Sequence, residues 1–202
     1  FVHPCPPRPR MKIFVLWRAK DPLAPALSAP QVAARLEAMF APILAPERTL
    51  QVRSAGSTHL AWLELPVEGF RAPFFEELGE RWALAPEYPL NARRLLRAHG
   101  IPPVEGSVLL QLGRELETRP AAYVRELGTP SALIWSNPEQ GEVLVQNDGL
   151  GQAQLFEYEQ DGLWVLTNRV MALRALRIEL EPLPEEWTAR FVTNWFPLDR
   201  TG

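Results

Sequence analysis

Apolar residues recur along the chain with either a strand-like or a helix-like period. Residues 12–18 form an almost continuous apolar, β-favouring run, which predicts a strand. Residues 30–43 place apolar side chains at helical spacing behind a proline, which predicts an amphipathic helix. Two β-rich runs within residues 49–65 meet at Ala55-Gly56-Ser57, a composition typical of a hairpin turn. The first third of the chain is therefore predicted as strand, helix and hairpin.

Helical periodicity returns in the middle of the chain. Residues 89–100, closed by a glycine, and residues 106–118 predict two helices, and residues 123–128 predict a short third one. The stretch before them is rich in large apolar residues, which we expect to anchor the core: Phe70, Phe74, Phe75, Leu78 and Trp82. We expect the acidic residues of that stretch to lie on solvated faces or at helix starts, namely Glu76, Glu77 and Glu80.

After Pro130 the pattern becomes strand-like. Four β-rich runs follow one another, separated by short turn sequences, at residues 131–135, 141–146, 153–159 and 162–167. Such spacing predicts an antiparallel meander. Helical patterns then return at residues 168–176 and 184–196. Strands in runs, with helices before and after them, predict an α+β layered domain rather than an alternating parallel sheet.

Composition limits the class of protein. A chain of 202 residues with 47% hydrophobic content can bury one substantial core. The net charge of -3 argues against nucleic acid as a partner, since no excess of basic residues attracts phosphates. We expect no membrane segment, because no apolar run approaches the ~20 residues of a spanning helix. Homo-oligomerisation stays open.

The single cysteine, Cys5, excludes an internal disulfide and a multi-cysteine metal site, and it favours a reducing, cytoplasmic location. Four of the first ten residues are prolines, which predicts a mobile leader over residues 1–10 and a domain over residues 11–202. The chain has no glycine-rich phosphate loop with lysine, no histidine pair at metal spacing and no Gly-x-Ser-x-Gly elbow. We therefore expect neither a cofactor nor a metal.

The order of elements in residues 107–176 carries a family resemblance. In that stretch "SVLL" leads through "LGTPSALIW" to "LVQNDGLGQAQLF" and then to "LTNRVMAL". This series resembles the second half of the class II glutamine amidotransferase domain at the N-terminus of asparagine synthetases, with Asp148 and Gly151 kept. The resemblance extends over residues 89–202, and over residues 11–88 by element order alone.

The resemblance implies an N-terminal nucleophile hydrolase fold, in which two antiparallel sheets stack face to face between outer helices (an α/β/β/α sandwich). It also implies that residues 147–151 form the corner between two core strands. Asp148 would tie down that turn through its side chain, and Gly151 would supply backbone freedom.

Departures from the family's motifs bear on activity. An active member exposes a cysteine as its first residue, whose free amino group serves as the base for the thiol. Here Lys12 follows Met11, and Cys5 becomes a nucleophile only if residues 1–4 are removed. The glutamine-holding motifs Arg-Gly-Pro-Asp and Asn-Gly-Glu are missing. Residues 104–107, which include Glu105, replace a Ser-Asp-Thr-Glu run, and Thr167-Asn168 replaces Ser-Glu.

Three functions follow from these observations. The first is a degenerate, non-catalytic amidotransferase-like domain that packs on an ATP-dependent amide synthetase or cyclase, in the same polypeptide or as a separate partner. Trp187, Phe191, Trp195 and Phe196 are its candidate interface, with core packing as the alternative.

The second function is an active amidotransferase that uses Cys5 after processing. The third is a binding module for an amino acid or amide that reuses the old glutamine cleft. Its candidate ligand-binding residues are Glu105, Asn147, Asp148, Thr167 and Asn168.

Overall fold

Two antiparallel sheets make up the centre of the protein. The computed structural model describes residues 12–20, 28–42, 49–64, 74–139, 141–148, 150 and 152–180, and the statements below concern these residues. The five-stranded sheet has the order β2-β3-β1-β9-β8. Its strands are β1 (Ile13–Ala19), β2 (Thr49–Ala55), β3 (Thr58–Glu64), β8 (Phe156–Gln160) and β9 (Leu163–Thr167).

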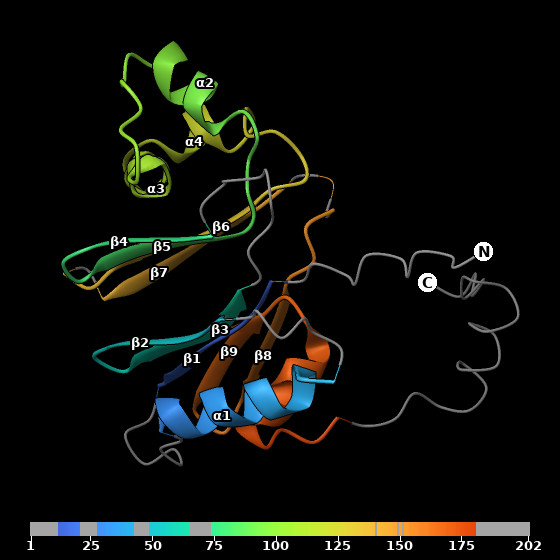
Figure 1. Ribbon diagram of the computed structural model, residues 1–202. Helices are drawn as coiled ribbons and strands as arrows, with labels where there is room; N and C mark the ends of the chain where they lie inside the picture. The colour runs from blue at the N-terminus through green and yellow to red at the C-terminus, as the bar shows by residue number, and fades with distance from the viewer. Residues whose placement is uncertain are drawn as a thin grey trace, which may run out of the picture.

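The second sheet has four strands in the order β4-β5-β6-β7. They are β4 (Phe75–Leu78), β5 (Arg81–Glu87), β6 (Ala132–Asn137) and β7 (Glu142–Asn147). Every neighbouring pair in both sheets is antiparallel. The two sheets lie face to face (Figure 1).

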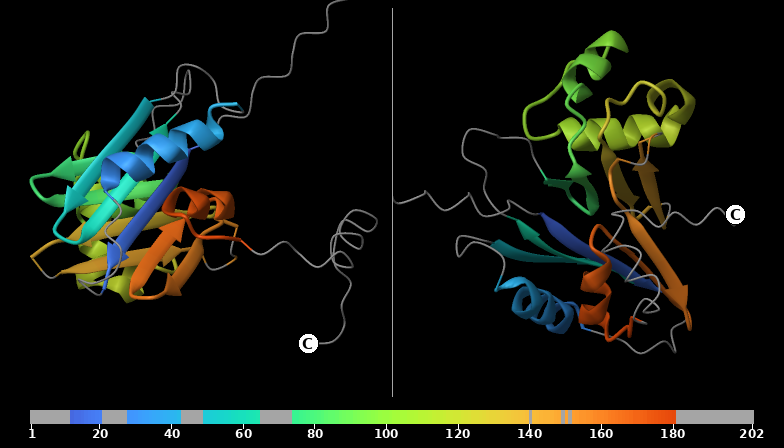
Figure 2. Two further views of the ribbon diagram at one scale, coloured as in Figure 1. Left: turned by 90° about the horizontal axis from the view of Figure 1, so that it is seen from below. Right: turned by 90° about the vertical axis from the view of Figure 1, so that its right-hand side faces the viewer.

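Helices cover the outer face of each sheet (Figures 1 and 2). On the five-stranded sheet lie α1 (Ala29–Phe40) and the 3₁₀ helix η1 (Val170–Leu176). On the four-stranded sheet lies α3 (Val108–Thr118), and α2 (Ala92–Ala98) and the one-turn α4 (Pro120–Tyr123) pack against α3. The layers therefore follow the order helix, sheet, sheet, helix, which is an α+β arrangement, as the sequence predicts. No helix in the described ranges has the length and apolar character needed to cross a bilayer.

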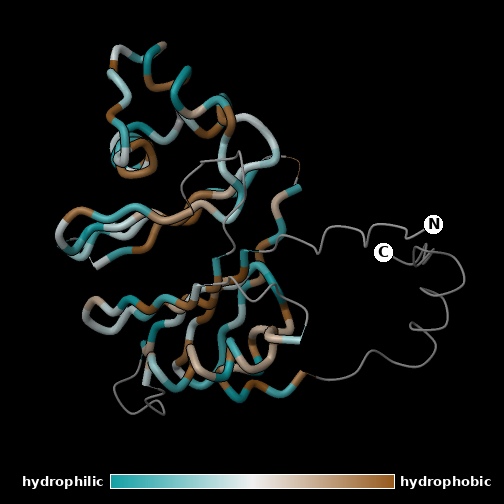
Figure 3. Tube along the Cα trace, viewed as in Figure 1, coloured by the Kyte–Doolittle hydropathy of each residue, from teal (hydrophilic) through white to brown (hydrophobic). Residues whose placement is uncertain are grey.

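Three apolar clusters lie between these four layers, and β1 contributes side chains to two of these clusters. Ile13, Val15 and Trp17 belong to the cluster beneath α1 and η1. Phe14 and Leu16 point the other way, into the cluster between the sheets. Both faces of the strand are thus buried, which explains why its sequence is continuously apolar instead of alternating. Figure 3 shows apolar residues along the strands of both sheets.

The space between the sheets holds large aromatic side chains. Trp62 from one sheet faces Phe75 of the other at a ring-centroid distance of 4.4 Å. Phe74 and Trp82 are each about 1% exposed, which confirms them as core anchors. Leu78 is 74% exposed, so its prediction as a core anchor is wrong. It stands at the end of β4 beside the turn at Gly79, where no layer covers it. Phe70 lies outside the described residues.

The predicted meander after Pro130 is also wrong in one respect. The four strands are antiparallel, but β6 and β7 pair in one sheet whereas β8 and β9 pair in the other. Alternating patterns define strands and turns but do not say when the chain leaves a sheet. The crossing occurs in residues 148–155, immediately after the Asn147-Asp148 corner.

Candidate functional site

The N-terminal end of β1 lies at the centre of its sheet, where several strands end together. Side chains from the end of β9 bind its main chain. Asn168 Oδ1 accepts the Phe14 N–H at 3.1 Å, and Asn168 Nδ2 donates to the Lys12 carbonyl at 2.7 Å. The Thr167 hydroxyl donates to the Phe14 carbonyl at 2.5 Å. Thr167 is fully buried and Asn168 is 7% exposed.

These contacts bear on two of the predicted ligand-binding residues. Thr167 and Asn168 are neighbours in the chain, and their polar atoms bind the backbone of β1. Asn168 extends the β1–β9 ladder one position past the last paired residues, Val15 and Thr167. The pair thus holds the start of β1 in place.

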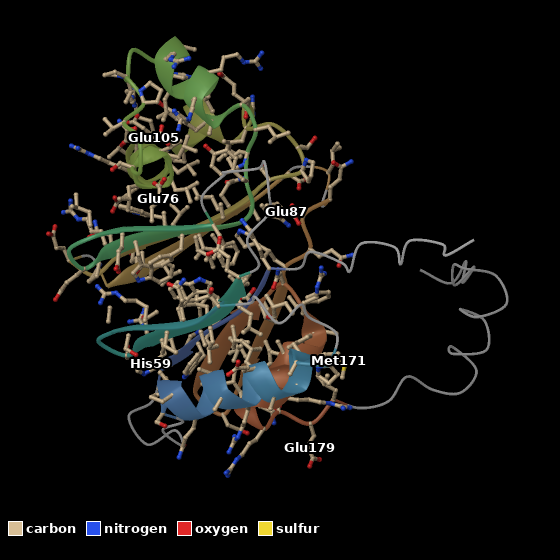
Figure 4. The ribbon with its side chains drawn as sticks, viewed as in Figure 1. His59, Glu76, Glu87, Glu105, Met171 and Glu179 are labelled. Atoms are coloured by element: carbon tan, nitrogen blue, oxygen red, sulfur yellow. The ribbon has the colours of Figure 1, made fainter. Side chains whose placement is uncertain are left out.

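Lys12 forms a charged cluster at this same end of the molecule. Its Nζ lies 3.9 Å from Glu64 Oε1 and 5.0 Å from the centroid of the Phe74 ring. The charge of Glu87, at the end of β5 in the opposite sheet, also acts on the Lys12 ammonium. Figure 4 labels Glu87. The Lys12 side chain is only 19% exposed. The start of β1 therefore presents an ammonium group beside the Glu64 carboxylate, within range of the charge of Glu87.

Burial lowers the pKa of Lys12 below its ordinary value, while the charges of Glu64 and Glu87 oppose that shift. The carboxylates favour the charged amine, and the aromatic face of Phe74 does the same. The cluster therefore combines an ammonium group with carboxylates. It contains no thiol or hydroxyl nucleophile among its described members.

Asp148 organises the corner at which the chain leaves one sheet for the other. Its carboxylate accepts four backbone N–H groups: from Ala153 at 2.8 Å, Leu150 and Gln152 at 3.0 Å, and Ser131 at 3.3 Å. Asp148 is 8% exposed. Although desolvation raises the pKa of Asp148, the hydrogen bonds from Gln152, Ala153, Ser131 and Leu150 outweigh it and hold the pKa below its ordinary value. The side chain ties down the turn, as the resemblance implies.

We expect Asp148→Asn to lower the midpoint of thermal unfolding at pH 7 by roughly 5–10 °C, because an amide accepts fewer N–H groups than a carboxylate. The folded pKa of Asp148 lies below its unfolded value, so its stabilisation is present above about pH 4 and is lost as the pH falls through the folded pKa. The deficit of the variant should therefore shrink toward pH 3. Thermal scans across this range test it, with the exposed Asp161→Asn as a control that should match the parent protein.

The other predicted site residues lie elsewhere. Asn147 Oδ1 accepts the Asp148 N–H at 3.0 Å and so supports the same corner. Glu105 precedes α3 in the outer helical layer, where it pairs with Arg93 of α2 at 2.5 Å (Figure 4). Glu105 therefore contacts α2, whereas Thr167 contacts β1. Cys5 and the interface candidates Trp187, Phe191, Trp195 and Phe196 lie outside the described residues.

Glu76 is a buried carboxylate in β4, so its prediction as a residue on a solvated face or at a helix start is wrong. It is 6% exposed, and its Oε2 accepts the N–H groups of Leu109 at 2.7 Å and Leu110 at 3.3 Å. It thus caps the first turn of α3 from β4 (Figure 4). Burial raises the pKa of Glu76, against the opposing hydrogen bonds from α3, and the nearby charge of Glu105 adds to the increase. A cap supplied from another layer leaves no local sequence signal.

The chain matches no family model. A search of curated proteins also finds no match. Within the described ranges, no three acidic, histidine or cysteine side chains are placed to hold a metal ion. The start of β1 and the residues that surround it therefore form the candidate functional site.

Proposed function

We propose that this chain is a non-catalytic glutamine amidotransferase-like domain of an asparagine synthetase-related protein. Its role is to pack against an ATP-dependent amide synthetase or cyclase, in the same polypeptide or as a partner. The resemblance of residues 107–176 supports the family, and the stacking of two antiparallel sheets between helices is compatible with the N-terminal nucleophile hydrolase sandwich that it implies. The corner held by Asp148 also agrees with the family's pattern.

The observation that carries the proposal is the chemistry at the start of β1. An active amidotransferase presents a cysteine thiol at the start of its first strand, with the α-amino group as its base. Here Lys12 stands at the start of β1, the first described strand, and Glu64 and Phe74 hold its ammonium. A protonated amine cannot attack the glutamine amide carbon. Nor do the nearby carboxylates stabilise the oxyanion that such an attack creates.

The test is glutamate release from glutamine. We expect none from the full chain and none from a version trimmed to begin at Cys5, because the described part of the strand supplies no nucleophile. The trimmed Cys5→Ala variant is the control. Release that is present in the trimmed protein and disappears with Cys5→Ala would refute the non-catalytic assignment and establish Cys5 as the nucleophile.

The Lys12 cluster also supports a second candidate, a binding module for an amino acid or amide. Lys12 complements a ligand carboxylate, and Glu64 and Glu87 complement its ammonium. If glutamine binds there, saturating glutamine should raise the thermal midpoint of the parent protein and leave that of Lys12→Met unchanged. Equal midpoints with and without glutamine in the parent protein would leave the scaffold role as the better explanation.

A further inference from the structure

The outer face of the five-stranded sheet is covered unevenly. Packing contacts place α1 on β2 and β3, and η1 on β1 and β9. β8 forms the edge of the sheet beyond them, among the described strands. Seen from below, the two helices lie side by side and leave the β8 side of this face open (Figure 2).

A groove of about 460 Å³ runs along this open side between the β8–β9 hairpin and the end of η1. Its apolar lining comes from Tyr158, Leu163, Leu176 and Ile178. Tyr158, Leu163 and Ile178 are only partly buried, although they pack against the cluster beneath α1. The floor of the groove is therefore an apolar surface that is continuous with the core and lacks a covering layer in the described part of the chain.

The end of η1 directs the chain along this groove. Arg177 has a φ of +62°, in the left-handed region, which ends the helix and turns the chain. Beyond it, Ile178 and Leu180 are partly buried while Glu179 between them is exposed. Glu179 points away from the molecule in Figure 4. Residues 178–180 therefore lie against the groove wall, and the segment that follows starts beside it.

Arg177 lines the groove together with Asp161 and Glu179, and Arg174 lies next to it in the adjoining pocket. Arg174 and Arg177 are exposed and line the adjoining pocket with Leu180. No ion pair joins either of them to another residue of the described part. The rim thus offers two guanidinium groups to an acidic occupant.

The sequence after Leu180 has the complementary pattern. Trp187, Phe191 and Trp195 recur every four residues and would share one face of a helix. Glu185 and Glu186 stand directly before them. Five residues span at most ~17 Å, so Glu185 cannot lie further than that from Leu180. That span is short enough for Glu185 and Glu186 to reach the arginines of the rim.

We propose that residues 184–196 form an amphipathic helix that docks in this groove. Trp187 and Phe191 cover Tyr158 and Leu163, and the acidic first turn faces Arg174 and Arg177. A helix of this length spans about 20 Å, comparable to a strand of five or six residues. The proposal goes beyond the amidotransferase-like role and does not depend on it.

Hydrogen exchange of the full chain tests the docking with two matched substitutions. Phe191→Ser removes an aromatic ring from the docked face, whereas Phe196→Ser removes one from the opposite face, since 196 lies 180° from 187 on a helical wheel. We expect Phe191→Ser to raise exchange about tenfold in residues 184–196 and in the β8–β9 hairpin. We expect Phe196→Ser to leave the hairpin unchanged.

Charge reversal supplies an independent measurement. Arg174→Glu with Arg177→Glu should increase exchange of the hairpin, and adding Glu185→Arg with Glu186→Arg should restore the parental rate. Hairpin exchange that is the same in Phe191→Ser as in the parent would overturn the proposal, as would equal effects of Phe191→Ser and Phe196→Ser. Either result would mean that the aromatic face is free to contact a partner instead. Neither result bears on glutaminase activity.

Discussion

Replacing Gly113 by alanine is expected to destabilise the protein by about 2–3 kcal/mol, although alanine is the better helix former. Gly113 is buried in α3 where the helix crosses Trp135 of β6. A Cβ at this position would lie 2.5 Å from Trp135 Cδ2 and 2.9 Å from Cγ, and closer still to Cε3. These atoms belong to the body of the indole ring, so α3 must move away from the sheet or the ring must leave its rotamer.

Trp135 has little freedom to move. Its Nε1 donates to Glu117 Oε2 at 3.2 Å, and Glu117 Oε1 accepts from Asn137 at 2.9 Å. The ring is 4% exposed and packs among the residues that join α3 to the sheet. The clash therefore outweighs the gain in helix propensity, which is about 1 kcal/mol.

Urea unfolding of three variants tests this prediction. Arg114→Ala, one residue along on the exposed face, should change the free energy of unfolding by less than about 0.5 kcal/mol. Trp135→Phe alone should be destabilising, because the smaller ring leaves an unfilled space beside Gly113. In the Gly113→Ala/Trp135→Phe double variant the alanine methyl group fills part of that space. The double variant should therefore lose less free energy of unfolding than the sum of the two single losses. A stabilised Gly113→Ala protein would show that α3 does not approach the sheet as described.

The sequence predicts local elements well in this protein because their signals are local. The helical spacing behind Pro30 predicts α1, and the turn composition at Ala55-Gly56-Ser57 predicts the β2–β3 hairpin, in which Gly56 takes a φ of +57°. The pattern at residues 168–176 predicts a helix, and the structure has the 3₁₀ helix η1 there. The α+β class follows from the same patterns.

Contacts and chain crossings between the layers were harder to predict from the sequence. The switch of the chain from one sheet to the other after Asn147 depends on which surfaces pack together, and alternation within a strand is the same in either sheet. The burial of Glu76 depends on α3, which begins 32 residues later in the chain. Neither relation leaves a signal within a short window of sequence.

The candidate site also has a part that the sequence predicts and a part that it does not. Thr167 and Asn168 were singled out from a family motif, and the structure places them together at the start of β1. Lys12, Glu64 and Glu87 were not predicted as a cluster, because they come from three strands in two sheets. A charged residue at the start or end of a strand is common, and only the tertiary fold shows that these three share a location.

Removal of the Asn168 side chain is expected to cost about 2–4 kcal/mol, one of the largest effects of any polar substitution in the described part of the protein. Asn168→Ala leaves the Phe14 N–H without its acceptor and the Lys12 carbonyl without this donor. Phe14 is fully buried, so water cannot easily replace the lost acceptor. The start of β1, which pairs with both β3 and β9, would then separate from its sheet.

Thr167→Val is the matched comparison, because it keeps the side-chain shape and removes the short hydrogen bond from the hydroxyl to the Phe14 carbonyl, together with longer ones to the Arg169 main chain. We expect it to cost about 1 kcal/mol. Urea unfolding gives both values, and amide exchange at Phe14 reports directly on the lost acceptor, with a large increase expected in Asn168→Ala. If Phe14 keeps its protection and stability changes by less than about 0.5 kcal/mol, Asn168 is not required to hold β1. Its amide would then be available for the ligand role that the sequence predicts.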